Sequence, residues 1–277
     1  MNTLSSYRIG SRSSEANNRI VSSESSILRA LFELRKTDIQ HGAINDNTQL
    51  TFWNCSWSPR ILQSLRKILV RDERRFASIK FFDCAIQSDT ISSELFAEIL
   101  GMILTNNSAT SLVIKGGRLL STINDDNSNG NSPLSCGSTL AVSPASISSP
   151  AISTALKDGL STNTSLRSLK VSGLELFSSP SAVTALADAL SKNSALESLN
   201  LRESSLADIS LAQLLRSVKE HPSITVLNLS RNYLGARTKS NAASSSSSAS
   251  SPVALDAVAE MLRSESSKLE SLDLSHQ

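Results

Sequence analysis

Residues 160–171 read LSTNTSLRSLKV, and residues 190–201 repeat that pattern as LSKNSALESLNL. Residues 218–229, VKEHPSITVLNL, follow with the same spacing. Each copy closes with three apolar residues in the order L-x-x-L-x-L, and these copies begin about 28 to 30 residues apart. Looser copies have their first position at Asn47, Phe76, Ala109 and Leu269, with a polar residue there in the copy at Asn47. A pattern that recurs at this period indicates a solenoid, in which each unit packs only against its neighbours.

Positions in each copy are counted from the first of the three apolar residues, so that Leu166, Leu169 and Val171 occupy positions one, four and six. The apolar run predicts a short strand, and apolar residues three or four apart before the next run predict a helix. Four expected helix starts carry a Ser-Pro pair: Ser58-Pro59, Ser149-Pro150, Ser179-Pro180 and Ser251-Pro252. Serine caps the first turn and proline suits the first helical position. The expected fold class is therefore α/β, with a parallel sheet on one side and helices on the other.

The pattern resembles the ribonuclease-inhibitor-like class of leucine-rich repeat proteins over about residues 45–277. The motif of that class places an asparagine three residues before position one, as Asn163 and Asn193 do, and an asparagine or cysteine at position nine, as Cys55 and Cys84 do. An asparagine at the helix end tolerates the left-handed conformation and is expected to bond free carbonyls. The resemblance implies a leucine-rich-repeat horseshoe with a concave parallel sheet and convex helices. It implies a binding scaffold and does not by itself imply an enzyme.

The chain divides into three parts. Residues 1–20 are expected to form a disordered leader, and residues 21–44 an amphipathic helix that caps the first repeat. Residues 45–277 are expected to form the repeat domain, with Ser-rich insertions at 121–148 and 236–251. A second interpretation makes residues 137–147 the strand of a degenerate eighth repeat. Gln277 is at position nine of its repeat, so we expect an incomplete polypeptide or an end that a partner covers.

Composition excludes several classes of function. The net charge of +2 with 19% charged residues requires neither a nucleic acid nor a membrane as partner. No apolar stretch is long enough to cross a bilayer. Residues 1–20 contain no apolar core of the kind that signal peptides have, so we expect no secretory signal. Three cysteines without a C-x-x-C pair indicate a reducing, cytoplasmic location. Cys55 and Cys84 are expected to be inert core thiols, although neighbouring repeats could bring them close enough for a disulfide.

No catalytic or metal-binding arrangement is visible. His41, His221 and His276 belong to distant repeats, and none is near a serine or cysteine in a nucleophile motif. Histidines and cysteines are too few and too scattered to ligate a metal, and no phosphate-binding glycine motif occurs. We therefore expect no enzyme activity and no cofactor.

The candidate site is the concave face, where alternate strand residues at positions three, five and seven point away from the helices. On neighbouring strands this face carries two aromatic and four cationic residues: Trp53, Lys80, Phe82, Lys115, Lys170 and Arg202. Aromatic residues beside cations are the composition that dominates binding energy at protein interfaces. In the alternative interpretation the aromatic pair packs under the N-terminal cap and the lysines are solvated.

These observations predict a non-catalytic scaffold that binds a protein partner on its concave face. Two alternatives stay open. One is a GTPase-activating protein similar to Ran GTPase activators, which share this repeat type and use a catalytic arginine, with Arg118 and Arg231 as nominal candidates. The other is a fragment of a NOD-like receptor sensor. The sequence does not indicate the oligomeric state.

Overall fold

The computed structural model describes residues 6–10, 23–41, 47–70, 75–87, 90–116, 118–120, 150–173, 177, 179–234 and 253–277. In these residues strands and helices alternate along the chain. The main strands, given in chain order, are β1 (Ser6–Gly10), β2 (Gln49–Trp53), β4 (Ser78–Phe82), β6 (Ser111–Lys115), β8 (Ser168–Ser172), β9 (Ser198–Asn200), β10 (Val226–Asn228) and β11 (Ser271–Asp273). They form one parallel sheet whose spatial order is also the chain order.

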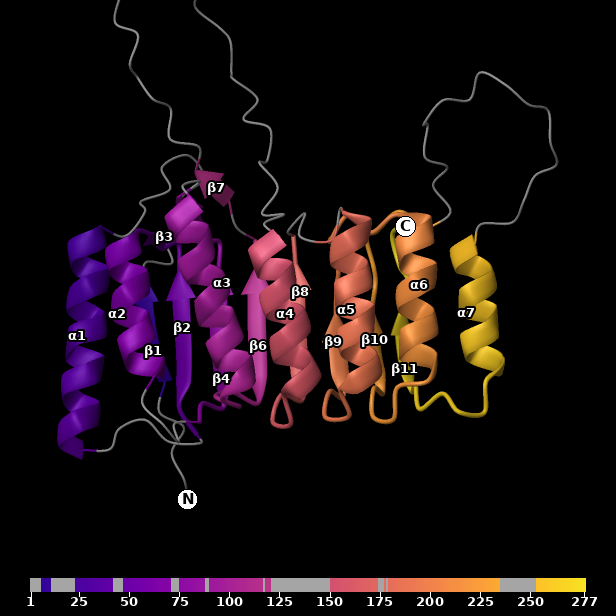
Figure 1. Cartoon of the computed structure of the whole chain (residues 1–277), viewed down its shortest axis with the longest axis horizontal. Coiled ribbons are helices and arrows are strands. Elements are labelled where there is room, and N and C mark those ends of the chain that lie inside the picture. Colours follow the sequence, from indigo (N-terminus) through magenta and orange to yellow (C-terminus); the bar gives the residue numbers. More distant parts are fainter. Residues whose placement is uncertain are drawn as a thin grey trace, which may run out of the picture.

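The helices lie side by side along one side of this sheet (Figure 1). They are α1 (Glu24–His41), α2 (Pro59–Leu69), α3 (Thr90–Thr105), α4 (Pro150–Thr162), α5 (Pro180–Lys192), α6 (Asp208–Lys219) and α7 (Val253–Arg263). The Ser-Pro pairs begin two of them as expected, since Ser58 Oγ accepts from the Ile61 amide and Ser179 Oγ accepts from the Ala182 amide, each at 3.4 Å. The architecture is thus a solenoid-like α/β fold with one long parallel sheet.

The strand register is the one that the repeat pattern predicts. Residues at position four pair from strand to strand, with Leu50 beside Ile79, Leu112 beside Leu169 and Leu199 beside Leu227. Strands β6 and β8 pair directly, from Ser111 and Ser168 onward, so no strand from residues 137–147 separates them. The interpretation of that segment as an eighth repeat is therefore wrong. Both expected insertions, 121–148 and 236–251, lie outside the described residues.

The sheet begins one strand earlier than the sequence analysis placed it. Residues 6–10, assigned to a disordered leader, form β1 and pair with β2 from Ser6 and Gln49 onward. Helix α1 packs against β1, and Ile9, Ile27 and Leu31 are buried in the same core. The expected cap over 21–44 is thus the helix of a further strand–helix unit. Residues 1–5 and 11–20 lie outside the described part.

A second, smaller sheet was not predicted. Its strands are β3 (Ser56–Trp57), β5 (Ala85–Gln87) and β7 (Arg118–Leu120), which pair in parallel. Each follows a main strand after a short turn, so the two sheets share the same unit spacing. Two of these strands begin one position after a cysteine at position nine, Cys55 or Cys84.

The core lies between the main sheet and the helices. Residues at positions four and six point into it, as do the apolar stripes of the helices, and nearly all are fully buried. Its N-terminal part is aromatic: the ring centroids of Phe52 and Phe81 are 5.3 Å apart, and Trp57 contacts both rings edge-on. Phe96 of α3 contacts Phe81 at 5.8 Å. Aromatic rings in this part replace the leucines of the later repeats.

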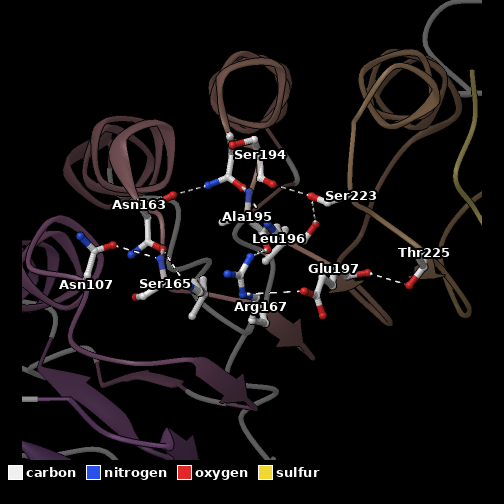
Figure 2. Close-up of polar contacts among 12 residues, drawn as sticks. Asn107, Asn163, Ser165, Arg167, Ser194, Ala195, Leu196, Glu197, Ser223 and Thr225 are labelled. Atoms are coloured by element: carbon white, nitrogen blue, oxygen red, sulfur yellow. Dashed lines mark hydrogen bonds and ion pairs between the residues drawn. The ribbon is translucent and has the colours of Figure 1, made fainter. Parts of the chain in front are cut away.

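Asparagine side chains at two helix ends, Asn163 and Asn193, tie their units to the one before (Figure 2). Asn193 Nδ2 donates to the carbonyls of Leu160 and Asn163, at 2.7 and 2.9 Å. Its Oδ1 accepts from the amides of Ala195 and Leu196, both at 2.9 Å. Asn163 makes the equivalent bonds one unit earlier. The predicted bonding to free carbonyls is confirmed. Asn193 is extended, with a φ of −81°, and does not use the left-handed conformation that asparagine tolerates.

A second ladder runs along the other edge, at position nine. Cys55, Cys84, Ser204, Asn232 and Gln277 each donate to the carbonyl at position six of the preceding unit. Carbonyl groups in the core are costly to leave without a hydrogen-bond partner. A small polar side chain at position nine therefore gives the carbonyl at position six a partner in the next unit.

Between these ladders, position eight is left-handed in every described repeat. The φ angle is 47° at Asn54, 51° at Asp83 and 58° at Arg231, and residues 116 and 173 are glycines. The amide at this position donates to the next unit; the bond from Asp83 to the Lys115 carbonyl, for instance, is 2.8 Å long. The left-handed turn thus extends the ladder of hydrogen bonds past the strand ends, which offsets its backbone strain.

We predict that replacing Asn193 by leucine lowers the free energy of unfolding by about 2 to 4 kcal/mol, because buried amides and carbonyls of two units lose their partner. Urea denaturation followed by circular dichroism measures the loss. Asn200→Leu, at a half-buried asparagine on the other face of the sheet, is the control and should cost much less. Equal losses in the two variants would contradict the structural role given to Asn193.

His221 takes the place of this asparagine one unit later and predicts a pH dependence. Its Nδ1 accepts from the amides of Ser223 and Ile224, at 3.3 and 3.2 Å, and so must be unprotonated. Burial lowers the pKa of His221 from 6.5 to about 4. Because the unfolded chain binds this proton more readily, stability from His221 is complete above pH 6.5 and is lost as the pH falls toward 4.

We therefore expect the free energy of unfolding to fall by about 2 kcal/mol more in the wild type than in His221→Asn between pH 7.5 and pH 5.0. Urea denaturation at the two pH values measures the difference, and asparagine retains the acceptor that Asn163 and Asn193 provide. Equal losses of unfolding free energy in the two proteins would show that His221 is not held neutral.

Candidate interaction surface

The side of the main sheet that faces away from the helices is called the open face, and it consists of the residues at positions three, five and seven. Side chains alternate along a strand, so these residues are opposite to the buried positions four and six. The burial pattern of β6 agrees: Leu112 and Ile114 are buried, whereas Ser111 and Val113 are half-buried and Lys115 is exposed. Elsewhere on the open face the small side chains of Thr51, Ser78 and Ser172 are buried. Every residue predicted for the candidate site belongs to the open face or to its continuation just past a strand end.

The two aromatic residues of the predicted site meet on this face. Trp53 of β2 and Phe82 of β4 pair in register, and their rings stack with centroids 4.2 Å apart and an interplanar angle of 23°. Both side chains are half-buried. On the other side of Trp53 the sheet places Gly10 of β1, which has no side chain to cover the indole within this row. The pair is therefore a broad, partly exposed aromatic surface held by two adjacent strands.

The four predicted cations follow on successive strands. Lys80 and Lys170 occupy position five of β4 and β8, while Lys115 occupies position seven of β6. Arg202 lies just past the end of β9, where the Asn200 side chain accepts from its amide at 3.2 Å. The charges alternate between two rows and so avoid standing directly opposite one another, where like charges repel. The predicted basic track is thus continuous over four neighbouring strands.

Arg8 is a further cation on this face that the sequence analysis missed. It occupies position five of β1, beside Thr51 and two strands from Lys80, and its side chain is exposed. A signal for it exists, because Leu4, Tyr7 and Ile9 have the spacing of positions one, four and six. That copy begins 43 residues before the next one, and the irregular interval concealed it.

The charge of the open face changes sign along the sheet. In the described strands from β1 to β10, positions three, five and seven hold no acidic residue, and the first one is Asp273 of β11. Hydrogen bonds from the Ser275 amide and hydroxyl hold the pKa of Asp273 below its usual value. Asp83 and Glu203 lie at the edge of the face, in the left-handed turns. The result is a cationic surface over β1 to β9 that ends at an acidic strand.

Cys55 and Cys84 are free and buried beneath the strand ends. The hydrogen bond with Cys84, together with burial, raises the pKa of the Cys55 thiol. A protonated, buried thiol is a poor nucleophile, which agrees with the expectation of an inert core thiol at Cys55.

The other residues weighed for chemistry do not converge. His221 is buried at the end of α6, while His276 is exposed after β11. The arginines considered for GTPase activation lie in different units, Arg118 in β7 and Arg231 in the turn after β10. Within the described ranges, no group of three or more histidine, cysteine, aspartate or glutamate side chains could hold a metal ion. None of the described helices has the length and apolar character required to span a bilayer.

No protein-family model matches the chain, and no curated protein matches it.

We predict that Phe82→Ala costs about 1 to 2 kcal/mol of unfolding free energy, because its ring is half-exposed and mainly forms one stacked pair. Phe81→Ala, one residue away but fully buried among aromatic rings, should cost about 3 to 5 kcal/mol. Urea denaturation of both variants measures the contrast. If Phe82→Ala lost as much unfolding free energy as Phe81→Ala, the result would favour the alternative interpretation, in which the aromatic pair serves folding alone.

Proposed function

We propose that this chain is a leucine-rich repeat protein of the ribonuclease-inhibitor-like class, a non-catalytic scaffold that binds an acidic protein surface on its open face. In this proposal the sheet is the concave side of a horseshoe and the scaffold acts in the cytoplasm. The observation that carries the proposal is the stacked Trp53–Phe82 pair with the basic track beside it.

Energetics favour this pair as the anchor of an interface. Trp and Arg are the residues most enriched among interface hot spots, and a broad aromatic surface buries a large apolar area on contact. Here it lies next to Lys115 in the same row, and Lys80 belongs to the same strand as Phe82. A partner surface with an apolar patch surrounded by carboxylates would complement both features.

Electrostatics favour an acidic partner. The chain as a whole carries only +2, yet five cations and no acidic residue occupy the described open-face positions from β1 to β9 and the end of β9. Such a concentration of positive charge raises the association rate of an acidic partner and selects against basic partners.

The backbone beneath this face supports binding at low entropic cost. Each main-sheet strand from β2 to β10 is paired on both sides, and side-chain hydrogen bonds from residues such as Asn193 and Asn232 join neighbouring units. A preorganised surface loses little conformational freedom when a partner binds.

Affinity capture from cell lysate tests the proposal with wild type and three variants. Trp53→Ala/Phe82→Ala removes the aromatic anchor, and Lys80→Gln/Lys170→Gln removes two cations of one row. Tyr233→Ala, which removes an exposed aromatic outside the open face, is the matched control. We expect one partner that both open-face variants lose at least tenfold and that the control retains, with unchanged circular dichroism.

Equal capture by all four proteins would overturn the assignment of the open face. If the captured partner is a small GTPase, its rate of GTP hydrolysis is measured with and without this protein. An acceleration that Arg231→Ala or Arg118→Ala abolishes would replace the scaffold by a GTPase activator.

A further inference from the structure

A groove lies between α1 and α2, on the helical side of the molecule and away from the open face. Its volume is about 400 Å³, and it is lined by Leu28, Arg29, Leu31, Phe32, Arg35, Ser64 and Lys67. Leu31 is buried and Leu28 half-buried, so they form an apolar floor. Arg29, Phe32 and Arg35 are three residues apart along α1 and share a face of that helix.

Phe32 is the aromatic residue among the residues that line this groove. Its side chain is 63% exposed, although Ile27, Leu31 and Leu34 of the same helix are buried in the core. An aromatic ring on a groove edge adds nothing to the core, and contact with another molecule would remove it from water.

The groove is also strongly cationic. Arg29, Arg35 and Lys67 are exposed, and no acidic residue is among the lining residues. The ion pairs formed between neighbouring helices elsewhere, such as Arg66–Glu98 and Lys157–Asp188, do not involve them. In the described part of the chain, therefore, no carboxylate forms an ion pair with these three groups.

We propose that this groove is a second docking site, which binds an acidic linear segment of a partner protein that carries one large apolar side chain. The apolar side chain packs against Phe32 and the leucine floor, and flanking carboxylates pair with the three cations. Arginine suits this role because its planar group binds a carboxylate in bidentate fashion. The volume holds one large side chain with the adjacent backbone, and not a folded domain. The proposal is independent of the function assigned to the open face.

The experiment pans a displayed library of random 12-residue peptides on the full chain. Two groove variants, Phe32→Ser and Arg29→Gln/Arg35→Gln/Lys67→Gln, change exposed side chains only, so the fold should persist in both. The matched control, Lys192→Gln/Arg216→Gln/Arg263→Gln, removes the same charge from exposed positions of α5, α6 and α7. Enriched peptides are synthesised with a fluorescein label, and their affinities are measured by anisotropy at low and high salt.

We expect enriched peptides with an apolar residue flanked by Asp or Glu. Each groove variant should weaken their binding at least tenfold, whereas the control and Trp53→Ala/Phe82→Ala change it less than twofold. Added salt should weaken wild-type binding more than that of the triple groove variant. Enriched peptides without acidic residues, equal binding by the groove variants, or a failure to select any groove-dependent peptide would each overturn the proposal.

A parallel arm measures sedimentation with vesicles of phosphatidylcholine containing 30% phosphatidylserine. Binding that the triple groove variant loses and its control retains would show that the cations serve a membrane surface, and would also overturn the peptide proposal.

Discussion

The structure depends on one requirement: backbone groups at the ends of each strand and helix must find partners, although they lie beyond the regular hydrogen bonds. The chain meets it by reaching across to the neighbouring unit. Asn193 bridges the carbonyls of the unit before it, and Asn232 does the same on the opposite edge. Because each partner belongs to another unit, no unit is complete alone, which is the reason that the apolar pattern and these polar positions recur together.

The sequence predicts the parts of the fold that this requirement makes periodic. Apolar residues at positions one, four and six give the correct register for β2 to β11, and the Ser-Pro pairs give two helix starts. The sequence fails where periodicity ends. Strand β1 was missed because a long interval separates Tyr7 from Leu50, its partner in the sheet. The second sheet was missed because its strands have two or three residues, too few to show alternation.

The candidate site shows the same division. Trp53 and Phe82 both occupy position seven of their repeats. Residues at the same position on adjacent strands lie side by side, so the repeat register alone predicts that these two are neighbours. Their stacking follows from packing, and no sequence pattern contains it. Arg8 could not be assigned without β1. The groove between α1 and α2 depends on the distance between two helices and on which residue of α1 stays exposed, and Phe32 could not be separated from its buried neighbours by type.

The cations of the open face lie toward β1, and its described acidic residue, Asp273, lies on β11. Since the strands stack along the long axis of the molecule (Figure 1), this arrangement gives the face an electric dipole along that axis. A charged partner in solution would experience a torque before contact, so the molecule would turn its N-terminal strands toward an approaching anionic surface. The order of the units along the chain thus encodes a direction of approach as well as a shape.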